Sequence, residues 1–184
     1  LFAKPVAEGT SKGIAATSKI DNYQALQRVC LNLLRTFQQP VLIEGYLPGR
    51  EFTVGIIGTG STATVLGVME VLLEEKAQTG VYSYYNKQNY QGLVKYGLVT
   101  GATDQACSEA ALKAWRGLGC RDAGRVDLKL DGAGVPNFIE VNPLAGLNPQ
   151  HSDLPILARL TGVDFSNLIT MILDAAQKRI NLQV

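Results

Sequence analysis

The chain has 184 residues, of which 46% are hydrophobic and 18% charged, and its formal net charge is +1. This length and composition allow a sizeable buried core, and the near-neutral charge excludes a bulk electrostatic attraction to nucleic acid or to a membrane surface. No apolar run approaches the roughly 18 residues of a transmembrane helix, and the three cysteines lack short metal-binding spacings. We therefore expect a cytoplasmic protein with reduced thiols and no nucleic-acid or membrane partner.

The first part of the chain predicts a strand end followed by a loop that can bind phosphate. Residues 1–4 have the pattern of a buried strand, residues 8–13 form a polar Gly-rich loop, and residues 14–16 and 22–36 predict a short strand and a helix. Backbone N–H groups of such a loop can hold phosphate oxygens, and Lys4 adds a positive charge. A plain connecting loop is the alternative, because the Walker spacing is absent. Since a strand begins at residue 1, we expect a fragment of a longer protein.

The middle of the chain predicts a sheet and a covering loop. Residues 41–47, 50–57 and 61–71 predict three strands that pair in one antiparallel sheet. Residues 82–90, which are rich in Tyr, Asn and Gln, predict a flap over a substrate; stacking on single-stranded nucleic acid and an inert surface loop are the alternatives. Helices are expected at residues 103–117, 154–160 and 165–180.

Residues 124–143 predict a β-hairpin, because apolar and polar residues alternate along both arms. The Asp-Gly-Ala-Gly stretch at 131–134 is a turn signal. Pro136 lacks a backbone N–H, so we expect it in the loop rather than in the ladder.

Four polar residues of this hairpin, Arg125, Asp127, Glu140 and Asn142, share one face for either even loop length. A six-residue loop places Asp127 opposite Glu140 and Arg125 opposite Asn142, whereas a four-residue loop places Arg125 opposite Glu140. Opposed residues have Cβ atoms about 5 Å apart, so two carboxylates and an amide oxygen would form a group suited to magnesium. By spacing alone, a solvated sheet face with an Arg–Glu pair is an equally good interpretation.

Five motifs in order resemble the ATP-grasp superfamily and, within it, the D-alanine–D-alanine ligase family. They are Lys4-Pro with the Glu-Gly-Thr-Ser-x-Gly loop, Glu44 followed by residues 49–54, the Tyr/Lys flap, the Arg-x-Asp and Glu-x-Asn hairpin, and the Gly/Ser loop after it. The resemblance implies an α+β ATP-grasp fold, with an antiparallel sheet flanked by helices, in a truncated fragment. Residues 1–40 would be part of the central subdomain with the phosphate loop, and residues 41–184 the C-terminal subdomain with the magnesium and oxyanion residues.

The resemblance also implies the cofactors ATP and magnesium. Two magnesium ions, replaceable by manganese, would be held by Asp127, Glu140 and Asn142. Lys4 matches the phosphate-binding lysine, and Glu51 matches the acceptor of the ribose hydroxyl groups. The complete implied ATP-binding set is Lys4, Glu8, Gly9, Thr10, Ser11, Gly13, Ile43, Glu44, Gly45, Tyr46, Leu47, Glu51 and Lys87.

The implied catalytic residues are Arg125, Gly146 and Lys87. The Arg125 side chain and the Gly146 N–H would stabilise an oxyanion, and Lys87 of the flap would touch the γ-phosphate. The substrate-binding residues would be Arg125, Gly146, Ser152, which holds the carboxylate of the second substrate, and Tyr84 of the flap. The loop at 143–149 departs from the family's commoner Thr-Ser-Pro-Gly-Met form and is one residue longer.

The implied function is an ATP-dependent amino-acid ligase that forms an amide bond through an acyl phosphate, namely D-alanine–D-alanine ligase in peptidoglycan precursor synthesis. Its partners would be small molecules, ATP and amino acids, and homodimers are common among full-length members. We expect little or no activity from the chain alone, because the family's N-terminal domain is missing. The altered 143–149 loop leaves a ligase for another amino acid or peptide open, and the truncation leaves a non-catalytic or inert nucleotide-binding fragment open.

Overall fold

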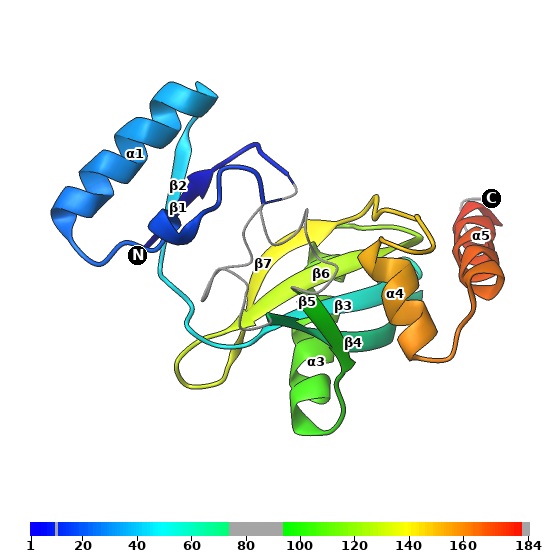
Figure 1. Ribbon diagram of the computed structural model, residues 1–184. Helices are drawn as coiled ribbons and strands as arrows, with labels where there is room; N and C mark the ends of the chain where they lie inside the picture. Colours follow the sequence, from blue (N-terminus) through cyan, green and yellow to red (C-terminus); the bar gives the residue numbers. More distant parts are fainter. Residues whose placement is uncertain (10, 74–93, 182–184) are drawn as a thin grey trace. The chain divides into compact units, whose positions relative to one another are not determined.

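The computed structural model describes residues 1–9, 11–73 and 94–181. The chain divides into two compact units (Figure 1), which are described separately. Unit 1 is Leu1–Pro48 with Leu72–Lys95, and unit 2 is Gly49–Val71 with Tyr96–Val184. The predicted flap at 82–90 lies outside the described residues, as does Thr10. The assignment of residues 1–40 and 41–184 to the two ATP-grasp subdomains stays a prediction.

Unit 1 is a two-stranded antiparallel sheet packed against one helix (Figure 1). Ala3, Ile20 and Leu33 are buried in its small core. The helix begins at Asn22, whose side chain accepts a hydrogen bond of 2.8 Å from the Ala25 N–H. Its elements are β1 (Phe2–Pro5), η1 (Ala16–Ser18), α1 (Tyr23–Phe37) and β2 (Val41–Glu44).

Two sequence predictions for this unit are wrong. The strand at 41–44 pairs with β1 and not with the strand at 50–57, because Val41 packs beneath α1 and completes the core around Ala3. Residues 14–16 form no separate strand, because the chain turns there: Gly13 has a φ of +82°, and η1 begins at Ala16.

Unit 2 contains, within the described residues, a five-stranded sheet in the order β5-β4-β3-β6-β7. β3 pairs antiparallel with β4 and β6, and β6 pairs antiparallel with β7. No single described helix is long and apolar enough to cross a membrane; α4 and α5 pass that test only together, as a pair bent by 110°. The elements are β3 (Glu51–Ile57), η2 (Gly60–Thr62), β4 (Thr64–Leu73), β5 (Val94–Leu98), α3 (Ala102–Gly117), β6 (Ala123–Leu130), β7 (Pro136–Asn142), α4 (Asp153–Leu160) and α5 (Phe165–Asn181).

Alternate residues of the central strands face opposite sides of the sheet. On one side α3 covers the strands (Figure 1). Its Trp115 packs into a buried cluster to which β3 and β6 contribute. The Trp115 Nε1–H donates to the Gly58 carbonyl oxygen at 3.0 Å, so its one polar atom is satisfied. The strand residues of this cluster include Phe52, Val54, Ile56, Val126 and Leu128.

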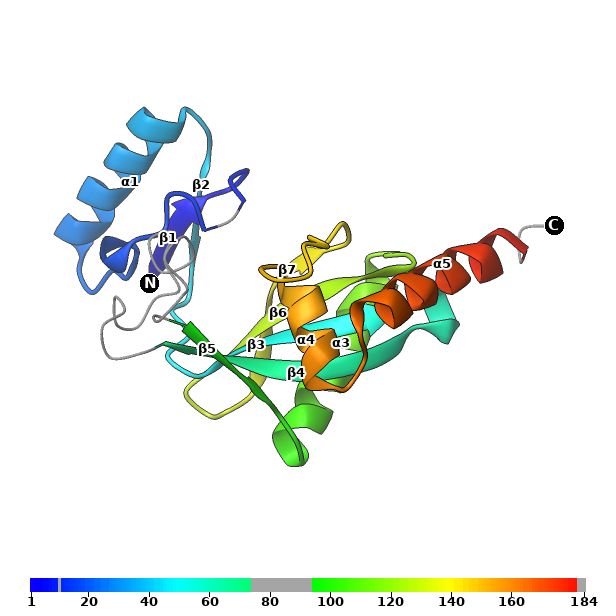
Figure 2. The same cartoon turned by 45° about the vertical axis from the view of Figure 1, so that its right-hand side comes forward.

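On the other side α4 lies against the sheet (Figure 2). Gly55 of β3 pairs there with Gly67 of β4. A Cβ atom on Gly55 would lie 2.9 Å from Leu157 Cδ2, and one on Gly67 would lie 3.3 Å from Leu157 Cδ1. Only glycine leaves room for Leu157 at both positions, so the pair Gly55 and Gly67 fixes where α4 docks.

The hairpin differs from its prediction in its turn. Pro136 is the first residue of β7 and not part of the loop, because the first residue of an edge strand can do without a ladder N–H. The turn therefore has five residues, 131–135, and the Asp131 carboxylate accepts hydrogen bonds of 2.9 Å from the N–H groups of Ala133 and Val135. A one-residue bulge then leaves Ile139 without an opposing residue.

Candidate active site

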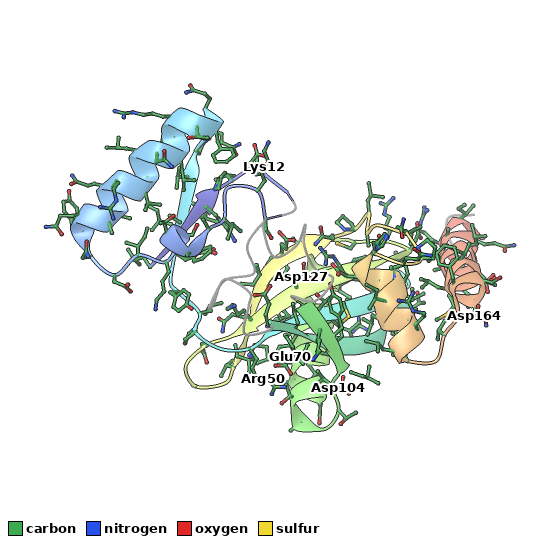
Figure 3. The ribbon with its side chains drawn as sticks, viewed as in Figure 1. Lys12, Arg50, Glu70, Asp104, Asp127 and Asp164 are labelled. Atoms are coloured by element: carbon green, nitrogen blue, oxygen red, sulfur yellow. The ribbon has the colours of Figure 1, made fainter. Side chains whose placement is uncertain are left out.

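The bulge gives the hairpin the cross-strand pairs that the predicted six-residue loop implied. Asp127 lies opposite Glu140, and Arg125 lies opposite Asn142. Asp127 is also opposite Thr53 of β3. Three strands therefore bring their polar side chains to the sheet face on which α4 lies, where Figure 3 shows Asp127.

Asp127 is the centre of this cluster. Its Oδ1 accepts a hydrogen bond of 2.9 Å from Thr53 Oγ1, and its Oδ2 accepts one of 3.2 Å from Asn142 Nδ2. The Arg125 Nη2 atom lies 3.4 Å from the same Oδ2. Asn142 Nδ2 also donates to Glu140 Oε1 at 3.1 Å, so the amide bridges the two carboxylates.

The surroundings of Asp127 determine how readily its carboxyl group ionises. Burial is the largest influence on Asp127 and raises the pKa of its carboxyl group to about 7; Arg125 lowers this pKa, and the Glu140 carboxylate raises it. An ionised Asp127 would therefore be stabilised by an additional cation beside it.

The donor set fits magnesium. Asp127 and Glu140 supply hard carboxylate oxygens, and a half-turn of the Asn142 amide would present its oxygen where its nitrogen now lies. Among the described residues no group of three or more His, Cys, Asp or Glu side chains could hold a metal, so a site here needs the Asn142 amide as its third ligand. A site with two carboxylates and one amide suits magnesium, which in proteins usually keeps waters and phosphate oxygens as its other ligands.

Arg125 is held from the α4 side by a residue that sequence reasoning missed. Its Nη1 atom forms an ion pair with Asp153 Oδ2, and both side chains are nearly buried. The Tyr96 hydroxyl donates to the other oxygen of Asp153 at 3.2 Å. The available signal was an acidic residue directly after Ser152 at the start of a helix, where a negative side chain is favoured. Thr53 was also missed, although it is a polar residue inside an apolar strand.

The loop before α4 brings together two predicted substrate residues. A Cβ atom on Gly146 would lie 2.6 Å from Ser152 Oγ, so these residues are neighbours. Ser152 Oγ accepts a hydrogen bond of 3.0 Å from the Asn148 N–H, and the Ser152 N–H donates to the Asn148 oxygen at 3.1 Å. Asn148 therefore sets the path of the chain from Gly146 to Asp153.

A second group on the same sheet face contains the predicted ribose acceptor. Glu51 lies opposite Lys129 in the β3–β6 ladder, and Lys129 Nζ is 2.9 Å from Glu51 Oε2. Glu51 is two residues from Thr53, so its side chain points to the side that carries Asp127. Arg50, the neighbour of Glu51, instead forms an ion pair with Glu70, and both residues lie near α3 (Figure 3).

In unit 1, two predicted ATP-binding residues contact each other. Lys4 Nζ of β1 lies 2.9 Å from Glu44 Oε1 of β2. Glu8 accepts a hydrogen bond of 2.9 Å from Gln39 Nε2, and Lys12 Nζ lies 3.0 Å from its other oxygen. These contacts attach the predicted phosphate loop to the end of α1.

Glycine is required at one position of this loop. A Cβ atom on Gly13 would lie 2.6 Å from Pro5 Cγ, and Gly13 also has a positive φ. Ser11 has a positive φ of 58°, and its carbonyl oxygen accepts from the Ile14 N–H at 3.0 Å. A Cβ atom on Gly9 would have no neighbour within 4 Å.

The predicted adenine edge begins at Ile43 and Glu44, the last residues of β2, and continues to Leu47. Ile43 is exposed and Leu47 half-buried, and a Cβ atom on Gly45 would lie in open space. Tyr46 stacks on Phe2 with ring centroids 6.4 Å apart, and Lys19 Nζ lies 4.9 Å from the Tyr46 ring. Tyr84 and Lys87 lie outside the described residues.

The fold resembles those of solved ATP-grasp ligases. A D-alanine–D-alanine ligase from Bacillus anthracis complexed with ATP matches with a TM-score of 0.73 at 19% identity, over 100% of this chain and 54% of that one. A D-Ala:D-Ser ligase from Enterococcus faecalis matches with a TM-score of 0.71 at 24% identity, over 95% of this chain and 48% of that one. The chain therefore has an ATP-grasp fold, as predicted.

Sequence comparison gives the family. The family model for the D-ala D-ala ligase C-terminus matches residues 1–174. A D-alanine–D-alanine ligase from Bordetella avium is 33% identical over 183 residues, which are 97% of this chain and 54% of that protein. One from Alcanivorax borkumensis is 34% identical over 180 residues, 97% of this chain and 55% of that protein. This chain belongs to the D-alanine–D-alanine ligase family, and it spans about half the length of these relatives.

Proposed function

We propose that this chain is the ATP-binding part of a D-alanine–D-alanine ligase, which forms an amide bond for peptidoglycan precursors in the cytoplasm. The observation that supports this function best is the group of Arg125, Asp127, Glu140 and Asn142 on one sheet face. Two carboxylates, an amide and a guanidinium suit a reaction in which phosphate charge is neutralised and an oxyanion develops.

The proposed reaction has two displacement steps. The carboxylate of the first amino acid attacks the γ-phosphorus of ATP, the bond to the ADP oxygen breaks, and an acyl phosphate forms. The amine of the second amino acid then attacks the acyl carbon and gives a tetrahedral oxyanion. The carbon–oxygen bond to phosphate breaks, the amine loses its proton, and an amide remains. No protein nucleophile is needed, so positioning and charge stabilisation are the protein's contribution.

The residues of the chain have separate roles in this scheme. Asp127, Glu140 and Asn142 would hold magnesium, which neutralises phosphate charge during transfer. Lys4 would bind phosphate oxygens with the backbone of the loop at 8–13, and Glu51 would accept from the ribose hydroxyl groups. Two ions and replacement by manganese are part of the proposal.

The oxyanion would be stabilised by the Arg125 guanidinium and the Gly146 N–H, and Ser152 would bind the second carboxylate. Removal of a comparable donor costs about 3–4 kcal/mol of transition-state stabilisation in other enzymes. Lys87 and Tyr84, at the predicted flap, would contact the γ-phosphate and the substrate. Glu44, Ile43 and the backbone from Gly45 to Leu47 would line the adenine.

Calorimetry with ATP and magnesium tests the proposal directly. Glu140→Gln should weaken binding of the magnesium–ATP complex by at least about tenfold, because it removes one carboxylate ligand. Glu70→Gln is the matched control: it is the same chemical change in an ion pair with Arg50 away from Asp127, and it should leave binding unchanged. Absence of binding to the unchanged chain would instead favour an inert fragment.

A ligase for a different amino acid or a peptide is the second candidate. The observation that favours it is the loop at 143–149, which departs from the family's commoner form and leads to the predicted substrate residue Ser152. Product analysis of a longer protein that includes this chain, with D- and L-amino acids offered singly and in pairs, distinguishes the two candidates. Exclusive formation of D-alanyl-D-alanine supports the first.

A further inference from the structure

The position of Arg125 poses a chemical problem for the proposed magnesium site. A guanidinium is a permanent cation with planar donors that match a carboxylate, so it competes with a metal for the same oxygens. Arg125 Nη2 lies only 3.4 Å from Asp127 Oδ2 and 4.0 Å from Glu140 Oε1. Both oxygens belong to the proposed ligand set, which we call the cation seat (Asp127, Glu140 and Asn142).

Within the described part of the chain, Arg125 also has an anionic partner on another element. Its Nη1 atom pairs with Asp153 at the start of α4, and the side chains of both residues are only 12–13% exposed. Because little solvent reaches this ion pair, the attraction between its charges is screened less than in a surface pair. Asp153 on α4 therefore competes with the acids of the seat for the Arg125 guanidinium.

Asp153 is itself held in place from two directions. The Tyr96 hydroxyl donates to its second carboxylate oxygen at 3.2 Å, and Tyr96 packs against the cluster of Met69, Ile156 and Leu157. The first turn of α4 favours the negative charge, and Leu157 fixes α4 on the sheet at Gly55. The carboxylate is thus an anchored group rather than a mobile surface acid.

We propose that Asp153 is a positioning residue that holds the Arg125 guanidinium off the cation seat, so that a divalent cation can bind there. This inference rests on the proposed function, because it assigns the seat to a metal. Without the Asp153 carboxylate, the two acids of the seat are the remaining anions that lie within 4.0 Å of Arg125 among the described residues. The guanidinium then pairs with them and displaces the metal.

Manganese alone is the probe, and the electron paramagnetic resonance signal of free Mn²⁺ is the readout on the 184-residue chain. Asp153→Asn should weaken Mn²⁺ binding by about tenfold, the usual effect of losing a group that orients a metal site. Asp122→Asn is the matched control, because Asp122 is another acid paired with an arginine, Arg179, outside the seat. It should bind Mn²⁺ like the unchanged chain.

The decisive variant is the double change Arg125→Gln with Asp153→Asn. If Asp153 acts by restraining Arg125, removal of the arginine restores Mn²⁺ binding to the level of the unchanged chain or above. A purely structural role predicts that the double variant binds as weakly as Asp153→Asn, and this result would overturn the inference. So would unchanged binding in Asp153→Asn.

Two further measurements keep the outcome interpretable. If Asp153→Asn does not fold, Tyr96→Phe replaces it: the ring packing stays, one hydrogen bond to Asp153 is lost, and a two- to threefold weakening is expected. Unchanged binding in that variant also overturns the inference. If the unchanged chain fails to bind Mn²⁺ with ATP present as well as alone, the cation seat itself is wrong, and the proposed function fails together with the inference. Equal Mn²⁺ binding by the unchanged chain and by Asp153→Asn overturns the inference alone.

Discussion

The two faces of β3 and β6 have opposite chemistry although the same strands supply both. Toward α3, the strands present Phe52, Val54, Val126 and Leu128, none of which is exposed to solvent. Toward α4 they present Thr53, Arg125 and Asp127, which are also mostly buried but polar. Burial stabilises the first face; on the second it disfavours the ionised form of Asp127. The difference indicates that the α3 face serves packing alone, whereas the α4 face combines packing around Leu157 with the polar residues of the proposed site.

The largest expected effect is on the α3 face. Trp115→Ala should lower the free energy of unfolding by about 3–5 kcal/mol, because a fully buried ring is lost and a cavity remains. Urea unfolding followed by circular dichroism measures this change. Phe138→Ala is the control, since that ring is 47% exposed and its removal should cost much less. Similar losses for both variants would contradict a dominant core under α3.

The second prediction concerns the charge on the other face. The folded pKa of Asp127 is raised from 3.8 to about 7, so its ionisation destabilises the folded chain. In metal-free buffer, the contribution of Asp127 to the free energy of unfolding is fully present below about pH 4. It falls by on the order of 2–4 kcal/mol as the pH rises to about 7. Asp127→Asn removes this loss, so the variant gains stability relative to the unchanged chain across that range. Urea unfolding at several pH values measures this difference. The prediction is wrong if the free energies of unfolding of the variant and of the unchanged chain differ by the same amount at every pH.

The smallest expected effect tests whether the two faces are coupled. A Cβ atom on Gly124 would lie 2.7 Å from Trp115 Cη2 and 2.5 Å from the Asn142 carbonyl oxygen. Gly124→Ala should therefore cost about 1–3 kcal/mol by overpacking and also weaken Mn²⁺ binding, because β7 must shift at Asn142. Gly117→Ala is the control: its new Cβ would meet no atom within 4 Å outside its own turn of α3, so it should not lower stability and should leave Mn²⁺ binding unchanged. A loss of stability with intact Mn²⁺ binding would mean that the faces are independent.

The alternating pattern predicted the hairpin and the shared face of Arg125, Asp127, Glu140 and Asn142, but not the five-residue turn and the bulge through which Glu140 and Asn142 reach that face. Local pattern succeeds here because the strand period of two depends only on neighbouring residues. The family resemblance, and not the pattern, gave the ATP-grasp fold that the solved structures confirm.

What the sequence left unpredicted depends on contacts between distant residues. Asp153 contacts Arg125, which is 28 residues away in the sequence, and Thr53 contacts Asp127, which is 74 residues away. The pairing of the strand at 41–44 with β1 was missed for a related reason, since partner choice in a sheet is set by the core it completes. Tertiary packing decides each of these contacts, and no local pattern encodes it.

The bulge at Ile139 decides which residues of the edge strand are indispensable. The five-residue turn alone, continued as regular pairing, would set Ile139 against Asp127 and direct Glu140 toward α3. Because of the extra residue, each later side chain of β7 points to the opposite side of the sheet. Deletion of Ile139 would straighten the strand and still leave Glu140 against Asp127, whereas one residue inserted beside it would turn the carboxylate inward. Related chains that keep Glu140 beside Asp127 should therefore tolerate the loss of this residue but not an insertion beside it.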